Sequence, residues 1–207
     1  MLTALTVTQF LDDTASNSPA PGGGSVSALA AALGAALTSM VCRLTIGKKK
    51  YAEVQSEMES ILRRSETIRE KATALIDEDT AAFNRVMAAF GLPKETEEEK
   101  AKRTAAVQEA TKDATRVPLR LMEVTAEAII LVKDVAARGN QNSLSDAGVA
   151  ALVLSAACDG AALNVRINLG GLTDQVFISS TRDTMDRIAA TVSAQTSEIL
   201  ANVRAVL

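Results

Sequence analysis

The chain has 207 residues and a formal charge of −3, with 47% apolar residues but only 2% aromatic ones. This length allows one large domain or two small ones, and the slightly acidic charge gives no electrostatic basis for a nucleic-acid partner. The absence of histidine excludes Ser–His and Cys–His catalysis and removes the commonest ligand of a zinc site.

The first segment, residues 6 to 15, predicts a short amphipathic helix with Val7, Phe10 and Leu11 on one face. The N-terminus has no basic region and meets two acids early, so it does not resemble a signal peptide. Cys42 and Cys158 each lie in a small apolar segment, which predicts buried free thiols in a reducing compartment. We therefore expect a cytoplasmic protein.

A loop of sequence PAPGGGS, residues 19 to 25, precedes a helix of small residues that we expect to run from Ser25 to about Ile46. The prolines stop an arriving helix, the glycines allow another molecule to approach the backbone, and Ser25 is expected to cap the helix. Two interpretations remain open at this point. The loop is either a flexible turn before a core helix or a site that offers backbone N–H groups to anionic or carbonyl oxygens.

The small-residue run between Gly22 and Cys42 is long enough to raise the question of a membrane span. Its Ala, Gly, Ser and Thr residues are weakly hydrophobic, and no aromatic belt flanks it. We therefore expect a buried central helix and no membrane partner.

Gly47 is expected to end this helix in the left-handed conformation, and three lysines and a tyrosine follow at residues 48 to 51. Their ordinary interpretation is a solvated turn. The alternative is a cluster that binds anions or transfers protons.

Apolar residues then recur at helical spacing from about residue 51 to 90, which predicts one long helix ended by Gly91 and Pro93. A charged segment, residues 94 to 103, begins the next helix, which we expect to reach about Ala137 with a kink at Pro118. A turn at residues 138 to 142 leads to a second small-residue helix that begins at Ser143 or Ser145. The last helix is expected over residues 173 to 206.

No segment alternates with a period of two, so the fold class is predicted to be all-α. We expect a single domain, residues 1 to 207, built as an up-and-down helical bundle. The small-residue helices 25 to 46 and 144 to 168 should pair at its centre, surrounded by long amphipathic helices. Because long helices with broad apolar faces usually find a partner, a homodimer is the default expectation.

Two polar groups interrupt the apolar pattern without an evident structural reason. Asp77 and Asp79 flank Glu78 before a mostly apolar helical turn, and aspartates two residues apart point to different sides of a helix, which makes a poor metal site. The ordinary interpretation is a solvated helix face, the commoner position of an aspartate.

The other polar group surrounds the start of the second small-residue helix. Capping explains Ser143 and Ser145, but it does not explain Asp146 or the two asparagines Asn164 and Asn168 one turn apart. Buried polar groups need partners, and a polar ligand is one candidate.

Together, the motifs PAPGGGS, IGKKKY, DEDTAAFNRVM and GNQNSLSDAGVAALVLSAACDGAALNV resemble the cyclodeaminase/cyclohydrolase family of folate enzymes over nearly the whole chain. The IGKKKY turn and the free-standing length resemble the family's stand-alone bacterial methenyltetrahydrofolate cyclohydrolases most. The resemblance implies an all-helical homodimer that binds a tetrahydrofolate derivative and hydrolyses 5,10-methenyltetrahydrofolate to 10-formyltetrahydrofolate. The bridging carbon of this substrate is already electrophilic, so neither a metal nor a cofactor is implied.

The resemblance also suggests roles for particular residues. Lys49 (a choice among three lysines) and Asp79 would transfer protons, and Asp146 would act in catalysis or accept hydrogen bonds from the pterin. The glycine loop would form the wall of a flat-ligand pocket, since it lacks the Lys-Ser/Thr and the preceding strand of a P-loop. The expected substrate-binding residues are Pro21, Gly22, Gly23, Gly24, Ser25, Lys48, Tyr51, Asn140, Asn142, Ser145 and Asn164.

Two other functions stay open on the sequence. A cyclodeaminase would act on the same folate carbon and release ammonia from 5-formimidoyltetrahydrofolate. A non-catalytic folate-binding helical protein would be expected to lose the polar residues within its apolar helices.

Overall fold

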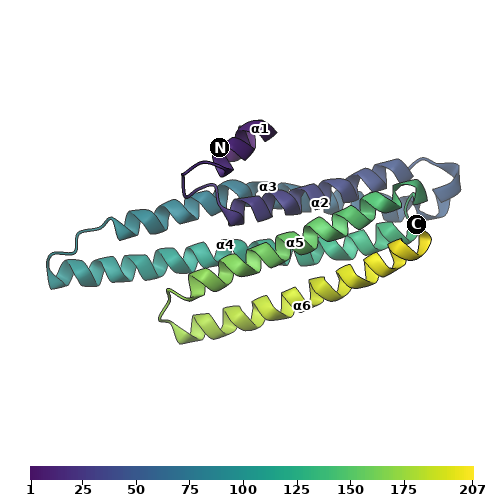
Figure 1. The fold of residues 1–207 in the computed structure, drawn as a ribbon. Coiled ribbons are helices and arrows are strands. Elements are labelled where there is room, and N and C mark those ends of the chain that lie inside the picture. Colours follow the sequence, from purple (N-terminus) through teal and green to yellow (C-terminus); the bar gives the residue numbers. More distant parts are fainter.

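Helices make up almost the whole protein, and a computed structural model describes residues 1 to 207 without a single strand. The predicted all-α fold is confirmed. Five long helices run up and down beside one another, and a short N-terminal helix lies apart from them (Figure 1). The helices are α1 (Val7–Thr14), α2 (Gly23–Thr45), α3 (Gln55–Phe90), α4 (Glu97–Arg138), α5 (Leu144–Leu169) and α6 (Gln175–Val206), with 3-10 turns at Leu2–Ala4, Lys49–Val54 and Gln141–Ser143.

Local capping explains where several helices begin and end. Thr96 and Glu99 form a capping box at the start of α4, and the Asp174 side chain accepts the Phe177 N–H at 3.1 Å at the start of α6. Gly47 follows α2 with a φ of +79°, as predicted. Pro118 lies inside α4, and the helix continues through it.

The start of α2 differs from the prediction. Gly22 occupies the N-cap position and Gly23 is the first helical residue, so Ser25 lies inside the first turn and does not cap the helix. Its hydroxyl instead donates to the carbonyl of Ile76 in α3 at 2.8 Å. This long-range hydrogen bond joins the two helices at the end of the bundle where α2 begins.

Small residues let α2 lie close to α5, which also packs against α4 and α6. The two helices run antiparallel, since Gly34 meets Leu154 and Gly160 meets Ser27. Buried alanines of both helices belong to one continuous apolar core. Cys42 and Cys158 are buried free thiols, as predicted, and burial raises the pKa of Cys42 to about 11.

The packing of Gly34 against Leu154 predicts a measurable cost for one added methyl group. A Cβ at Gly34 would lie 2.6 Å from Leu154 Cγ, so Gly34→Ala should lower the free energy of unfolding by about 1–3 kcal/mol, the usual cost of overpacking a core. Urea denaturation followed by circular dichroism measures this change. Gly171→Ala is the matched control, because its nearest neighbour would lie at 3.6 Å. Equal stability of the two variants would contradict the packing argument.

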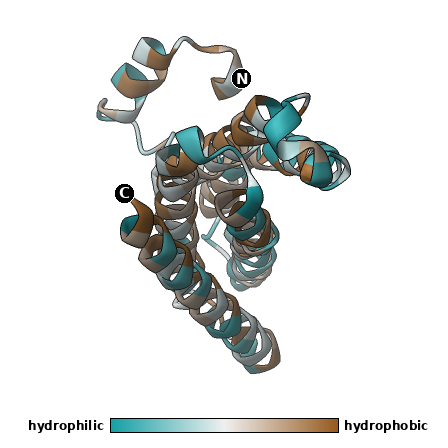
Figure 2. Cartoon of the chain, turned by 90° about the vertical axis from the view of Figure 1, so that its right-hand side faces the viewer, coloured by the Kyte–Doolittle hydropathy of each residue, from teal (hydrophilic) through white to brown (hydrophobic).

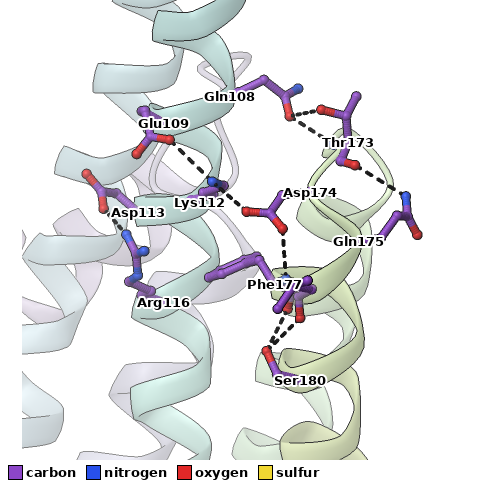
Figure 3. Close-up of polar contacts among 11 residues, drawn as sticks. Gln108, Glu109, Lys112, Asp113, Arg116, Thr173, Asp174, Gln175, Phe177 and Ser180 are labelled. Atoms are coloured by element: carbon purple, nitrogen blue, oxygen red, sulfur yellow. Dashed lines mark hydrogen bonds and ion pairs between the residues drawn. The ribbon is translucent and has the colours of Figure 1, made fainter.

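A polar network holds the start of α6 against α4 (Figure 3). Lys112 Nζ lies 2.9 Å from the Asp174 carboxylate, and the Thr173 N–H donates to Gln108 Oε1 at 2.9 Å. Lys112 and Arg116 both lie over the Phe177 ring. The Phe177 N–H and Lys112 together hold the pKa of Asp174 below its usual range. These contacts fix the turn between α5 and α6.

Helix α1 lies apart from the other helices, as the view along the bundle also shows (Figure 2). Only Phe10 of the predicted apolar face is buried, while Val7 is 79% and Leu11 60% exposed. The three side chains line one shared cavity, as expected of residues on one face, but Val7 and Leu11 remain largely exposed. Asp77 anchors the segment before α1, because its carboxylate accepts hydrogen bonds from the Leu2 N–H and the Thr3 hydroxyl.

Two helical segments, Gly23–Thr45 and Gln141–Leu169, are long and apolar enough to cross a membrane by length and composition alone. Their most apolar windows are 61% and 50% buried inside the bundle. Core helices of soluble proteins have the same properties, so these segments are weak evidence for a membrane protein.

Candidate functional site

A cavity of about 360 Å³ lies at the end of the bundle where α2 begins. Its lining on α3 comes from residues 79, 83, 86, 87 and 90, a spacing that places them on one face of that helix. The glycine loop, α4 and the last turns of α5 complete the walls. The lining residues are Pro19, Ala20, Gly22, Gly23, Gly24, Asp79, Phe83, Val86, Met87, Phe90, Ala114, Asn164, Ile167 and Asn168.

The cavity combines a polar part with an apolar wall. Asn164 Nδ2 donates to the Gly160 carbonyl at 2.9 Å, and Asn168 Nδ2 donates to the Ala114 carbonyl at 3.1 Å. Neither asparagine Oδ1 accepts a hydrogen bond within the chain, so both remain available as acceptors for a ligand. Phe83, Phe90 and Ile167 belong to the apolar wall.

Asp79 lies directly against the first turn of α2. A Cβ at Gly24 would lie 2.0 Å from Asp79 Oδ1, so any other residue here would force the carboxyl group or the helix turn to move. Ser25 Oγ lies 3.1 Å from Asp79 Oδ2. The missing side chain at Gly24 thus leaves room for the Asp79 carboxyl group against the first turn of α2.

Burial raises the pKa of Asp79 above its ordinary value, and hydrogen bonds from the Ser25 hydroxyl and backbone N–H oppose the rise. The positive end of the α2 dipole also favours the ionised carboxylate. The group therefore exchanges its proton closer to neutral pH than an ordinary aspartate. A carboxyl group with these properties in a cavity is suited to general acid–base catalysis.

The remaining predicted site residues lie at the other end of the bundle. Tyr51 Oη accepts the Gln141 N–H at 3.0 Å and lies 3.4 Å from Asn140 Oδ1. Asn140 Nδ2 donates to the Leu44 carbonyl at 3.1 Å, and the Asn140 N–H donates to Thr45 Oγ1 at 2.8 Å. These bonds attach the turn before α5 to the end of α2. The length of α2 separates this end from the cavity by roughly 30 Å.

Several side chains at this end have no partner within the chain. We call Lys49, Asn142, Ser145 and Asp146 the distal cluster. Asp146 is half-buried and the other three are exposed, and their side chains make no ion pair or hydrogen bond. Lys48, Lys49 and Lys50 are all exposed in the chain.

The two serines near the start of α5 were expected to act as caps. Ser143 occupies the N-cap position, but its side chain makes no capping hydrogen bond. Ser145 lies inside the first turn and is exposed. Capping therefore does not explain either serine.

Comparison with known proteins decides the family. The family model described as formiminotransferase-cyclodeaminase matches residues 6 to 187. A methenyltetrahydrofolate cyclohydrolase of Methylorubrum extorquens is 47% identical over 199 residues, which cover 96% of each chain. The chain belongs to the formiminotransferase-cyclodeaminase family.

Other relatives carry the second activity in their names. The formimidoyltransferase-cyclodeaminase of Rattus norvegicus is 38% identical over 95% of this chain, which spans 36% of that longer protein. The crystal structure of a formiminotetrahydrofolate cyclodeaminase from Thermotoga maritima superposes with a TM-score of 0.90 at 29% identity, covering 99% of this chain and 98% of the other. The fold is therefore shared by family members named for either reaction.

The cavity brings together only part of the predicted site. Gly22, Gly23, Gly24, Asp79 and Asn164 line it as a group. Ser25 supports Asp79 from inside the helix, and Pro21 is buried in the loop without lining the cavity. The other predicted residues lie at the opposite end, namely Lys48, Lys49, Tyr51, Asn140, Asn142, Ser145 and Asp146.

Sequence reasoning missed the apolar wall of the cavity. Phe83, Val86, Met87 and Phe90 follow Asp79 at helical spacing in the last turns of α3. The chain has four Phe, one Tyr and no Trp, so two of its few aromatic side chains line this one cavity. The position of two of these few aromatic residues close together after Asp79 was the signal in the sequence that could have identified the wall.

Proposed function

We propose that the protein hydrolyses 5,10-methenyltetrahydrofolate to 10-formyltetrahydrofolate. The observation that carries this proposal is a half-buried carboxyl group, Asp79, at a cavity with free amide acceptors and an aromatic wall. The near full-length similarity to a protein named methenyltetrahydrofolate cyclohydrolase supports the same reaction. The substrate has matching parts, since its pterin is polar, its C1 bridge is cationic and its p-aminobenzoyl ring is flat and apolar.

The proposed chemistry needs one well-placed proton acceptor. The Asp79 carboxylate stabilises the cationic bridge and takes a proton from the water that attacks the bridging carbon. The resulting C1 hydroxyl collapses to a formyl group on N10 as the bond from C1 to N5 breaks. N5 gains a proton, and one proton is released overall. The carbon is electrophilic from the start, so the proposed reaction uses no metal or cofactor.

A spectroscopic assay tests this function directly. Loss of the methenyltetrahydrofolate chromophore should accelerate with enzyme at a pH where spontaneous hydrolysis is slow. The high structural similarity to a cyclodeaminase makes ammonia release from 5-formimidoyltetrahydrofolate the second candidate. Enzyme-dependent ammonia release without chromophore loss would favour that reaction and contradict the proposal.

The raised pKa of Asp79 predicts the acid side of the pH–rate profile. Because the ionised form acts as the base, kcat/KM should fall as the pH drops through a pKa above the ordinary 3.8 of an aspartate. Chromophore assays at a series of pH values locate this transition. A rate that stays constant down to the ordinary aspartate pKa would contradict the assigned role.

The aromatic wall predicts a binding defect without a chemical one. Phe83→Leu should raise KM about 2- to 10-fold with little change in kcat, because stacking contributes roughly 0.5–1.5 kcal/mol beyond burial. Steady-state kinetics separate the two constants. Phe177→Leu is the matched control. Phe177 is a residue of α6 that lies beneath Lys112 and Arg116 of α4, outside the cavity. Equal KM values for the two variants would argue against a stacking role.

We further propose that the protein is a cytoplasmic homodimer with no nucleic-acid or membrane partner. Two free cysteines support a reducing compartment. One surface, which we call the α2–α5 face, supports pairing with a second copy because it exposes seven large apolar side chains on the two central helices. These are Val26, Leu33, Leu44, Val149, Leu152, Leu163 and Ile167, which are 40–77% exposed.

A further inference from the structure

The hairpin formed by α3 and α4 extends past the other helices at the cavity end of the bundle (Figure 1). It carries the apolar wall of the cavity outward, because Phe90 lies roughly 16 Å along α3 from Asp79. The outer end of this wall is open to solvent, since Met87 is 50% and Phe90 47% exposed. A ligand that follows the wall from Asp79 therefore reaches the tip of the hairpin beside Phe90.

One cation of α4 lies at this outer end. Arg103 Nε donates to the Phe90 carbonyl at 3.0 Å, and Arg103 Cζ lies 5.4 Å from the centroid of the Phe90 ring. Ala114 is the residue of α4 that lines the cavity, and it lies about three full turns from Arg103, which places both on one side of the helix. Arg103 thus lies on the cavity side of α4, over the outermost residue of the wall.

The charge of Arg103 has no acidic partner in the chain. Its neighbours on α4 are paired, since Lys100 Nζ lies 2.7 Å from Glu97 Oε1. Lys102 Nζ lies 2.7 Å from Glu98 Oε1 in the same way. Arg103 forms no ion pair, and the bond from Nε is the only hydrogen bond that its half-buried side chain makes. Its two terminal NH2 groups remain free, and such a pair binds a carboxylate through two parallel hydrogen bonds.

We propose that Arg103 binds a carboxylate of the glutamate tail of the substrate and selects folates that carry this tail. The C1 bridge, the p-aminobenzoyl ring and the glutamate follow one another in the substrate. With the bridge at Asp79 and the ring along the wall from Phe83 to Phe90, the glutamate reaches Arg103. The proposal rests on the proposed cyclohydrolase function for the identity of its ligand.

Phe90 prepares Arg103 for this contact. The ring and the Phe90 carbonyl together fix the guanidinium, so less side-chain freedom is lost when a carboxylate binds. Hydrogen bonds to a charged group are stronger than neutral ones, but partial exposure to solvent weakens the ion pair. The contact should therefore change affinity about 5- to 20-fold.

Two unreactive ligands that differ only in tail charge test this role. These are folic acid and its diamide, in which both tail carboxyl groups are carboxamides. The wild-type protein should bind folic acid about 5- to 20-fold more tightly in titration calorimetry. Arg103→Met should lose this preference, because methionine keeps apolar packing over Phe90 without a charge. The affinity of this variant for the diamide should stay close to that of the wild type.

A purely structural role of Arg103 gives a different result. If Arg103 only held Phe90 in place, Arg103→Met would bind both ligands more weakly and keep the wild-type preference. That result would overturn the proposal, and so would a wild-type protein that binds folic acid no more tightly than the diamide. Arg103→Lys should keep part of the preference, because an ammonium group keeps the charge without the planar fork.

Lys102→Met is the matched control for Arg103→Met. It removes the same charge one residue away, from a side chain that is 73% exposed. The preference for folic acid should remain at the wild-type value in this variant. A loss of preference as large as that of Arg103→Met would assign the effect to the net charge of the hairpin and contradict a specific contact.

Turnover separates this proposal from the proposed function. Arg103→Met should raise the KM for methenyltetrahydrofolate about 5- to 20-fold with little change in kcat, because the reacting carbon lies at Asp79, far along the wall. A wild-type protein without turnover that still prefers folic acid through Arg103 would refute the function and leave the tail contact standing. Full turnover with an unchanged KM in Arg103→Met would refute the tail contact alone.

Discussion

Replacing Asp79 with Asn should lower kcat by about 10²- to 10⁴-fold, the range expected on losing a general base. The amide keeps the shape of the side chain and can still accept the hydrogen bonds from Ser25, but it cannot take a proton from water. Assays of methenyltetrahydrofolate loss measure the change. Turnover within a few-fold of wild type would remove Asp79 from the mechanism.

The same substitution should raise the unfolding temperature at neutral pH. Burial raises the pKa of Asp79 in the folded state, so ionisation costs folding free energy above that pKa and nothing below the unfolded value near 3.8. An amide removes this cost, and the gain in stability should disappear as the pH falls below the unfolded value. Thermal denaturation at neutral and acidic pH measures both effects.

Glu78→Gln provides the control for both measurements. Glu78 is the neighbour of Asp79 and forms an exposed ion pair with Arg120. Its loss should leave kcat unchanged and alter stability little, since exposed pairs contribute at most about 1 kcal/mol. A loss of turnover equal to that of Asp79→Asn would indicate a general defect of this helical turn.

Gly24→Ala should lower turnover by about 10²-fold through displacement of the Asp79 carboxyl group, a loss typical for a misplaced catalytic group. The added Cβ would lie 2.0 Å from Asp79 Oδ1 and 2.4 Å from its Cγ, so the side chain of Asp79 or the first turn of α2 has to move. Alanine has a helix propensity about 1 kcal/mol more favourable than that of glycine, so a loss of turnover in Gly24→Ala would not come from a weakened helix. Steady-state kinetics measure the loss of turnover, and thermal denaturation measures the stability of the variant.

Gly23→Ala is the matched comparison, because its Cβ would lie at an ordinary 3.5 Å from Asn164 Nδ2. It should keep Asp79 in place and lose much less turnover. A double-mutant cycle sharpens the argument, since Gly24→Ala should cost less stability when Asp79 is already Ala. Equal costs in both backgrounds would mean that the clash with Asp79 is not the cause.

The number, order and approximate bounds of the helices were predictable from the sequence. Helical periodicity, Gly47 after α2 and the polar start of α4 are local signals, and local signals determine helix ends within a few residues. Ser25 was assigned as a cap for the same local reason. Its hydroxyl is used instead by the Ile76 carbonyl in α3, a contact that no local pattern contains.

The candidate site was predictable only in part. The glycine loop, Asp79 and Asn164 meet as the motifs indicated, but the turn residues near Tyr51 and Asn140 lie at the far end of α2. Motifs identify residue types and their order along the chain. They do not show that the 23 residues of α2 hold the two groups of site residues at opposite ends of the bundle. Val7 and Leu11 illustrate the same limit, because their spacing predicts a face but not whether anything covers it.

The hydrogen bonds of Tyr51 have an optical consequence. The chain contains one tyrosine and no tryptophan, so its intrinsic ultraviolet fluorescence comes from a single ring beside the turn before α5. That ring lies roughly 30 Å along α2 from the cavity of its own chain. The protein thus carries a built-in fluorophore whose emission samples only the end of the bundle where Asn140 and Gln141 are attached.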